Sequence, residues 1–183
     1  MRVIAGVHKG RVLEAPAWDG LRPTSDRLRE TLFNVLALRI REARVLDGYA
    51  GTGAVGIEAL SRGAVHVTFV ESDRRAQTLI EKNLARCGIS DGYAIIRAPA
   101  GRAFETIRQT PSFAPFDIVL LDPPYDHPAE QALIGVDALL APGSVVVLEH
   151  ARRMPAPSEI GGLVSTRNLV SGDSALAFYV CRP

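Results

Sequence analysis

The sequence predicts an α/β fold in which a mostly parallel sheet carries helices on both faces. Short apolar runs typical of buried strands alternate with longer segments of helical periodicity, and such alternation favours a parallel sheet. A glycine-rich loop joins the first strand to a helix between residues 47 and 56. Near the C-terminus, the apolar runs Leu163–Val170 and Ala175–Cys181 flank the turn Ser171–Asp173. They predict a hairpin with one antiparallel strand at the sheet edge.

The individual elements follow from the spacing of apolar residues. Residues Arg2–Ala15 are expected to form a β-hairpin that turns at His8–Gly10. Ser25–Ile40 should form an amphipathic helix, and Arg152–Gly162, with two prolines and two glycines, should be a loop. Strands are expected near residues 44–47, 66–71, 94–98, 116–121 and 144–149, and helices near 54–62, 73–87, 100–109 and 128–140.

The loop after the first strand carries the strongest ligand signal. Gly51, Gly53 and Gly56 match the pattern G-x-G-x-x-G, and Glu71 follows Gly51 by 20 residues, at the end of the next strand. Glycines allow a tight turn and close approach of the backbone, and an acid at that distance can accept from ribose hydroxyls. The pattern predicts a cofactor that contains a nucleoside. The alternative is that the glycines only turn the chain.

Asp47, just before these glycines, favours one class of cofactor. A dinucleotide would place its pyrophosphate at this loop, where a carboxylate is unfavourable. S-adenosylmethionine has no phosphate and carries a positive sulfonium and an ammonium group, so an acidic residue there is favourable. We therefore predict S-adenosylmethionine and not a nicotinamide dinucleotide.

A second loop, Asp122-Pro123-Pro124-Tyr125, follows the apolar run Phe116–Leu121. Ligands of open α/β sheets bind at the carboxyl ends of the strands. Two prolines make the loop stiff and remove two N–H donors, which leaves a carboxylate, carbonyls and an aromatic ring for a flat substrate with an N–H donor, such as a nucleobase amine. These four residues are the predicted catalytic residues. The alternative is a proline-rich turn with a packing tyrosine.

Together these motifs resemble the amino-methylating class I methyltransferases, which have a Rossmann-like fold and use S-adenosylmethionine. The segments Arg2–Gly6, Lys9–Leu13 and Arg22–Asn34, together with Ser171–Ser174, resemble the 16S ribosomal RNA guanine-N2 methyltransferases of the RsmD type. The resemblance covers essentially the whole chain. Together with the two loops it implies the cofactor-binding residues Asp47, Gly48, Ala50, Gly51, Gly53, Glu71, Ser72, Ala100 and Asp122.

One segment departs from the family pattern. After the third strand the family usually has an acid that contacts the adenine amino group, whereas this chain has Arg97–Gly101, without an acid. A backbone carbonyl in this segment is expected to serve instead.

The charge is unevenly distributed. The whole chain has a formal net charge of only +1, but residues 1–44 contain nine Lys and Arg against five Asp and Glu, a net +4, which leaves −3 for the rest. A basic module on a mildly acidic body is expected of a phosphate-binding surface. The predicted RNA-binding residues are Arg2, Lys9, Arg11, Arg22, Thr24, Arg27 and Arg29. For Arg39, Arg41 and Arg44 a solvated helix face is preferred.

The composition agrees with one intracellular domain. The chain has 183 residues, 47% of them hydrophobic, enough for a full core. We expect an N-terminal extension over residues 1–24 and a catalytic core over 25–183. The two cysteines lie far apart, which indicates a reducing compartment and no metal cluster. We expect no signal peptide, no membrane span, a cytoplasmic location and a monomer.

The predicted reaction is direct methyl transfer to guanine N2. Asp122 and the Pro123 carbonyl would accept from the amine, and Tyr125 would stack on an unpaired or flipped base. Two other functions remain open. One is an amino methyltransferase acting on DNA adenine, DNA cytosine or a protein side chain. The other is an inactive RNA-binding assembly factor. The expected partner is 16S ribosomal RNA, either as naked RNA or within a partly assembled small subunit.

Overall fold

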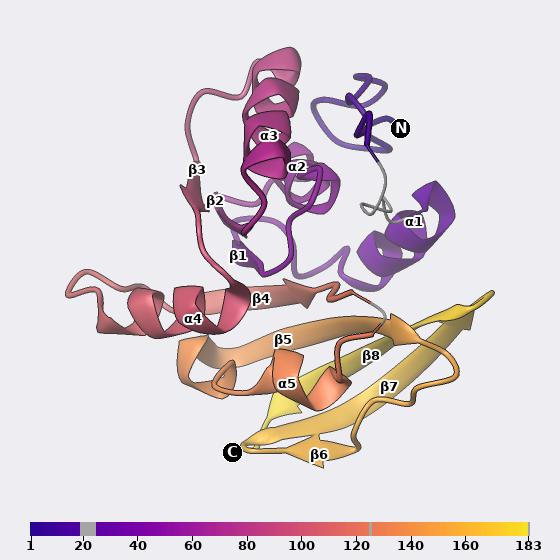
Figure 1. The fold of residues 1–183 in the computed structure, drawn as a ribbon, viewed down its shortest axis with the longest axis vertical. Coiled ribbons are helices and arrows are strands. Elements are labelled where there is room, and N and C mark those ends of the chain that lie inside the picture. Colours follow the sequence, from indigo (N-terminus) through magenta and orange to yellow (C-terminus); the bar gives the residue numbers. More distant parts are fainter. Residues whose placement is uncertain (19–24, 125, 183) are drawn as a thin grey trace.

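The chain folds around one twisted sheet with helices on both sides (Figure 1). The structure, a computed structural model, describes residues 1–18, 25–124 and 126–182. Within this part the sheet has eight strands in the order β3-β2-β1-β4-β5-β8-β7-β6. The strands β3, β2, β1, β4 and β5 are mutually parallel, and β8 pairs antiparallel with β5 and β7. The predicted fold class is confirmed.

Most elements lie where the sequence placed them. The strands are β1 Arg44–Asp47, β2 His66–Val70, β3 Tyr93–Ile96, β4 Phe116–Leu121, β5 Leu140–Ala151, β6 Glu159–Ile160, β7 Leu163–Ser171 and β8 Ser174–Cys181. The helices are α1 Asp26–Val35, α2 Ala54–Ser61, α3 Arg74–Cys87, α4 Ala100–Gln109 and α5 Ala129–Leu133, with a short 3₁₀ turn η1 at Asp137–Leu139. No helix in these described ranges is long and apolar enough to cross a bilayer.

The two faces of the sheet bury separate cores. One face packs against α1, α2 and α3 through residues such as Phe33, Ile57 and Ile80. The other face packs against α4, α5 and η1 through residues such as Phe104 and Leu133. Successive residues of a strand point to opposite faces, so the predicted parallel strands read as continuous apolar runs.

Several elements differ from the prediction, and β5 begins at Leu140, four residues before the expected start. Ser25 is the N-cap of α1, as predicted, but the helix ends at Val35 and not at Ile40. Tighter turns then lead to Ile40, which is still buried. The helix expected over 128–140 stops at Leu133, because Gly135 has φ +74 and interrupts it before η1. The loop expected over Arg152–Gly162 contains the two-residue strand β6.

A further difference concerns the C-terminal hairpin. Its two strands and the turn at Gly172 are as predicted, and Gly172 has φ +62, as expected at the first position of a two-residue hairpin loop. The antiparallel strand β8 lies inside the sheet between β5 and β7, however, and not at the edge. The edge is formed by β6, which pairs with the start of β7.

The N-terminal segment is not the predicted two-stranded hairpin. Its ends pair through one isolated bridge, Arg2 with Val12, and the chain between them turns at the expected position without forming strands. Backbone bonds from Val3 N to Arg11 O and from Leu13 N to Met1 O flank this bridge, but the N–H groups that follow it bond to α2. Glu58 accepts from Ile4 N at 2.7 Å and Ala5 N at 2.9 Å, and Ser61 Oγ accepts from His8 N at 3.0 Å.

Candidate active site

The strand order reverses between β1 and β4, and the two predicted loops follow these neighbouring strands. This reversal is the point at which open α/β sheets bind ligands. A hydrogen bond of 2.8 Å from Gly48 N to Leu120 O joins the two strand ends. The topology thus places the glycine-rich loop and the Asp122–Pro124 segment beside each other.

The three glycines of the first loop serve different purposes. Gly51 and Gly53 have φ +53 and +76, a left-handed conformation that favours glycine. Gly56 lies in α2, and a Cβ on it would lie 2.2 Å from a ring carbon of Phe69. The first two glycines therefore shape the turn, while the third allows α2 to pack closely on β2.

Glu71, at the end of β2, is oriented by the same loop. Its Oε2 accepts from Gly51 N and its Oε1 from Asp73 N, both at 2.8 Å. The Glu71 carbonyl also accepts from Gln77 Nε2 at 2.7 Å. The carboxylate is thus fixed next to the glycine turn, where a ribose hydroxyl could donate to it.

Asp47 lies beneath the loop with only 4% of its surface exposed. Its Oδ2 accepts from Gly56 N at 3.0 Å, at the start of α2. Burial raises the pKa of this carboxyl to about 7; the Gly56 hydrogen bond opposes the shift, and the charges of Asp122 and Glu71 add to it. Three carboxylates therefore create a negative potential at this end of the cleft, which suits a cationic ligand.

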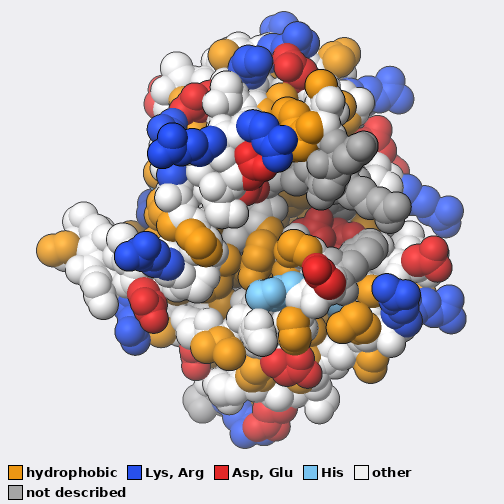
Figure 2. Space-filling model, in the orientation of Figure 1, with side chains coloured by type: hydrophobic (Ala, Val, Ile, Leu, Met, Phe, Trp, Pro, Cys, Tyr) orange, Lys and Arg blue, Asp and Glu red, His pale blue; other side chains and the backbone are white. Residues whose placement is uncertain are grey.

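A cleft of about 1200 Å³ opens above these strand ends. Figure 2 shows the hollow near the centre of the face, with acidic and apolar side chains inside it and Lys and Arg around its periphery. Its volume exceeds that of a typical single-ligand pocket and leaves room for a nucleoside cofactor and a base together. A smaller cavity of about 80 Å³ adjoins it and is lined by residues that include Asp47, Ala50, Gly51 and Asp122.

Most predicted cofactor residues face these cavities. The large cleft is lined by Gly48, Gly51, Glu71, Ser72, Ala100 and Asp122, and Asp47 and Ala50 line the smaller one. Gly53 lines neither cavity and acts through its backbone conformation. Ala98 and Pro99, just before α4, also line the cleft, so the segment that lacks an acid lines the same cleft as Glu71 and Ser72.

The Asp122–Pro124 segment enters the cleft directly after β4. Asp122, Pro123 and Pro124 all line the cleft, and Pro123 is buried while Pro124 is exposed. The Pro124 carbonyl accepts from His127 N at 2.8 Å, which closes the turn. Tyr125, the fourth predicted catalytic residue, lies outside the described residues.

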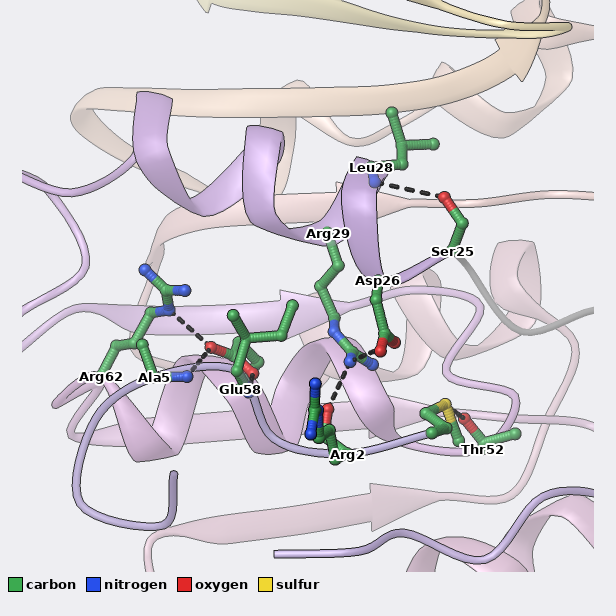
Figure 3. Close-up of polar contacts among 11 residues, drawn as sticks. Arg2, Ala5, Ser25, Asp26, Leu28, Arg29, Thr52, Glu58 and Arg62 are labelled. Carbon is green, nitrogen blue, oxygen red and sulfur yellow. Dashed lines mark hydrogen bonds and ion pairs between the residues drawn. The ribbon is translucent and has the colours of Figure 1, made fainter. Parts of the chain in front are cut away.

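The predicted RNA-binding residues do not form one group. Arg2, Lys9, Arg11 and Arg27 are exposed, and Arg22 and Thr24 lie outside the described residues. The prediction that Arg29 binds RNA is wrong, because its side chain is fully buried and beyond the reach of a phosphate. Its guanidinium donates to the Arg2 carbonyl and to Asp26 Oδ1 at 2.9 Å (Figure 3).

The same buried network holds the N-terminal segment in place. Glu58 is fully buried and lies between Arg62 and the backbone of Ala5 (Figure 3), accepting from Arg62 Nε at 2.7 Å. Asn83 of α3 accepts from Glu14 N at 2.7 Å and donates to Thr52 O at 3.0 Å. The N-terminal segment is therefore bonded to both α2 and α3. Through Asn83 it is also connected to Thr52 of the glycine loop.

Several residues of the cleft were absent from the predicted site. Tyr49 and His127 lie with ring centroids 6.2 Å apart, and both line the cleft with Glu149 at the end of β5. Arg102 and Arg108 line it from α4. Glu149 could have been found, because it follows an apolar run just as Asp47 and Asp122 do. The arginines gave no signal beyond the exposed face of an amphipathic helix.

Comparison with known proteins establishes the family. The family model described as "Conserved hypothetical protein 95" matches residues 1–180. The chain belongs to this family. It is 36% identical over 182 residues to ribosomal RNA small subunit methyltransferase D of Escherichia coli strain K12, covering 98% of this chain and 89% of that protein. The protein of the same name from Haemophilus influenzae is 39% identical over 158 residues, covering 85% and 81%. The predicted RsmD-type resemblance is confirmed.

Solved structures agree with this assignment. The protein yhhF of Escherichia coli superposes with a TM-score of 0.81 at 35% identity, covering 98% of this chain and 96% of that one. A more distant structure of the same fold, SMU.776, was solved with SAH (TM-score 0.68, 13% identity, 83% and 49% covered). Class I methyltransferases use S-adenosylmethionine, so the predicted cofactor class is confirmed for this fold.

Proposed function

We propose that the chain methylates ribosomal RNA with S-adenosylmethionine and that its acceptor is the exocyclic N2 amine of a guanine in 16S RNA. One observation carries the proposal: the glycine loop after β1 and the Asp122–Pro124 segment after β4 open into a single cleft. A donor site and an acceptor site on neighbouring strands are what direct group transfer needs. The names of the relatives in Escherichia coli and Haemophilus influenzae support ribosomal RNA as the substrate.

The residues of the first loop fit the cofactor. The Glu71 carboxylate would accept from the ribose hydroxyls, and the Asp47 carboxyl would balance the positive charge. The adenine would lie between Ser72 and the Ala98–Ala100 backbone, where carbonyl groups replace the missing acidic contact. When bound, the cofactor supplies an electrophilic methyl group.

The acceptor loop would prepare the amine. The lone pair of a guanine N2 amine is delocalised into the ring, so the amine is a poor nucleophile. Hydrogen bonds from its two N–H groups to the Asp122 carboxylate and the Pro123 carbonyl would favour a pyramidal nitrogen whose lone pair points toward the methyl group. The protein contributes mainly alignment, with Tyr125 stacking on the base and Asp122 placed to take the proton released on transfer.

The RNA would contact the protein outside the cleft as well. The exposed Arg2, Lys9, Arg11 and Arg27 are proposed to bind phosphates without reading sequence. Within the described residues the lining of the cleft begins at Ser25, so the N-terminal cations would position the RNA and leave selection of the base to the cleft. We still expect the protein to be a monomer in the bacterial cytoplasm.

The test is methylation of 16S RNA, with and without small-subunit proteins, followed by mass spectrometry of the nucleosides. N2-methylguanosine is the expected product. N6-methyladenosine or N4-methylcytosine would instead support another amino methyltransferase. Calorimetric binding of S-adenosylmethionine without turnover on any RNA would support an inactive assembly factor, and binding of only a nicotinamide cofactor would contradict the proposed cofactor.

A further inference from the structure

A second carboxylate lies beside Asp122 in the cleft. In the parallel pair of β4 and β5, Leu121 is opposite Leu148, so the next residues on the two strands are Asp122 and Glu149. Residues opposite each other on neighbouring strands point to the same face of the sheet, and the strands lie roughly 4.8 Å apart. Both side chains line the large cleft and the smaller adjoining cavity. The acceptor loop is therefore flanked by an acid on the neighbouring strand.

Burial of the Glu149 carboxylate at this position is energetically unfavourable. Glu149 is only 8% exposed and directly follows the buried apolar run Val145–Leu148. Burial of a carboxylate is unfavourable unless hydrogen-bond donors compensate it. An ionised carboxylate only accepts, and its two oxygens offer about four acceptor positions. It can therefore keep a contact within the protein and still accept from a ligand in the cleft.

We propose that Glu149 selects guanine by accepting from the N1–H group of the target base. The inference rests on the proposed function and identifies which base the acceptor loop takes. In guanine, one of the two ring nitrogens beside the exocyclic amine, N1, carries a hydrogen, while the other, N3, is an acceptor. In adenine and cytosine, the ring nitrogen beside the amine is an acceptor with a lone pair. A carboxylate next to the amine-binding segment therefore attracts guanine and repels the other two bases.

The arrangement matches the donors of guanine in number. The two N2 hydrogens go to the Asp122 carboxylate and the Pro123 carbonyl, and the N1 hydrogen goes to Glu149. The negative charge beside N1–H also increases electron density in the ring and so opposes delocalisation of the N2 lone pair. Glu149 thus distinguishes guanine from adenine and cytosine, which the Asp122–Pro124 segment alone does not.

The test uses a base that keeps the 2-amine but lacks both the N1 hydrogen and the 6-oxygen of guanine, and the Glu149→Gln variant separates the contribution of the N1 hydrogen from that of the oxygen. After the methylated guanosine has been located in the wild-type product, two RNAs are prepared with guanosine or 2-aminopurine riboside at that site. Wild-type protein should methylate the guanosine RNA faster under single-turnover conditions by on the order of 10- to 100-fold, as expected for one hydrogen bond to a charged group. In Glu149→Gln the preference should fall to within about threefold, because an amide can donate or accept.

Two outcomes would overturn the inference. One is equal rates of the wild-type protein on both RNAs, a result that needs no variant to fold. The other is an unchanged preference in Glu149→Gln, with Glu149→Ala as a second variant and urea denaturation as the folding control. Cofactor affinity, measured by calorimetry, should stay within about twofold of the parent, which separates base selection from a contact to the cofactor. A wild-type product other than N2-methylguanosine would instead refute the proposed function.

Discussion

Two buried carboxylates on adjacent elements have opposite surroundings. Glu58 is fully buried in α2 and receives three hydrogen bonds, from Ile4 N, Ala5 N and Arg62 Nε. Asp47 is nearly as buried at the end of β1, but it lies near the charges of Asp122 and Glu71, and its pKa is raised to about 7. The charge of Glu58 is neutralised by the protein itself and fixes the N-terminal segment, whereas the charge at Asp47 favours a cation from outside.

The largest effect is expected from removal of Glu58. Glu58→Ala leaves two backbone N–H groups and the Arg62 guanidinium without their acceptor, and loss of one partner of a buried ion pair costs about 3–5 kcal/mol. The free energy of unfolding, measured by urea denaturation, should fall by that amount. Glu58→Gln keeps one acceptor oxygen and should lose less. If Glu58→Ala were as stable as the parent, the N-terminal segment would not depend on this network.

The next effect concerns the acceptor side of the cleft. Asp122→Ala removes the carboxylate proposed to align the amine, so the single-turnover rate should fall by about 100-fold or more. Overall RNA affinity should remain nearly unchanged, and affinity for S-adenosylmethionine should fall less than it does in Glu71→Ala. Glu71→Ala is the matched control, because it should weaken cofactor binding in calorimetry. A loss of RNA affinity in Asp122→Ala comparable with its loss of rate would contradict the alignment role.

The raised pKa of Asp47 predicts a pH dependence of stability. The folded carboxyl titrates near pH 7 and the unfolded one near 3.8, so between these values the folded state holds a proton that the unfolded state does not. The free energy of unfolding of the free protein should therefore decrease as pH rises from about 4 to about 7, by at most about 1.4 kcal/mol per pH unit. The measurement is urea denaturation across this range.

Two controls assign this slope to Asp47. Asp47→Asn cannot ionise and should flatten the curve over the same range. Bound S-adenosylmethionine should also flatten it, because a cation lowers the pKa of the neighbouring carboxyl. Equal slopes in the parent and Asp47→Asn would show that the pH dependence arises elsewhere.

The smallest effect is expected at the exposed cations of the N-terminal segment. Replacing both Lys9 and Arg11 by Gln should weaken RNA binding and reduce the salt dependence of log K by about one per lost phosphate contact, with little change in the rate at saturating RNA. The control replaces Lys82 and Arg86 by Gln, two equally charged residues that face Glu14 at 3.8 and 3.5 Å. Similar losses in both double variants would indicate a net-charge effect and not a local binding surface.

The sequence predicted those features that depend on local pattern. Strands β1, β2 and β4 and the two loops were found because apolar runs ended by Gly, Asp or Pro define them. The predicted N-terminal hairpin is reduced to one antiparallel bridge, because a side chain from α2, distant in sequence, takes the backbone hydrogens of Ile4 and Ala5. The helix over 128–140 was wrong because one glycine took a left-handed conformation.

Two side chains of the site region show what pattern alone leaves open. Arg29 was grouped with the exposed cations, although it lies one turn before Phe33 and shares its buried face. The helical spacing indicated burial, but the prediction relied on the positive charge of the side chain. Glu149 was taken only as the end of a strand, because its significance depends on β5 pairing with β4. Pairing between distant segments is a tertiary property that the spacing of residues in one segment does not reveal.

The hydrogen bond from Gly48 N to Leu120 O has a consequence for substitutions in the cleft. It belongs to a strand pairing that fixes the donor loop relative to the acceptor loop, and slippage of that pairing by one residue would turn every side chain to the wrong face. The relative position of the two loops is therefore set by the backbone pairing and not by the side chains of the cleft. A substitution in the cleft wall should alter the contacts to a bound molecule without shifting the two loops relative to each other.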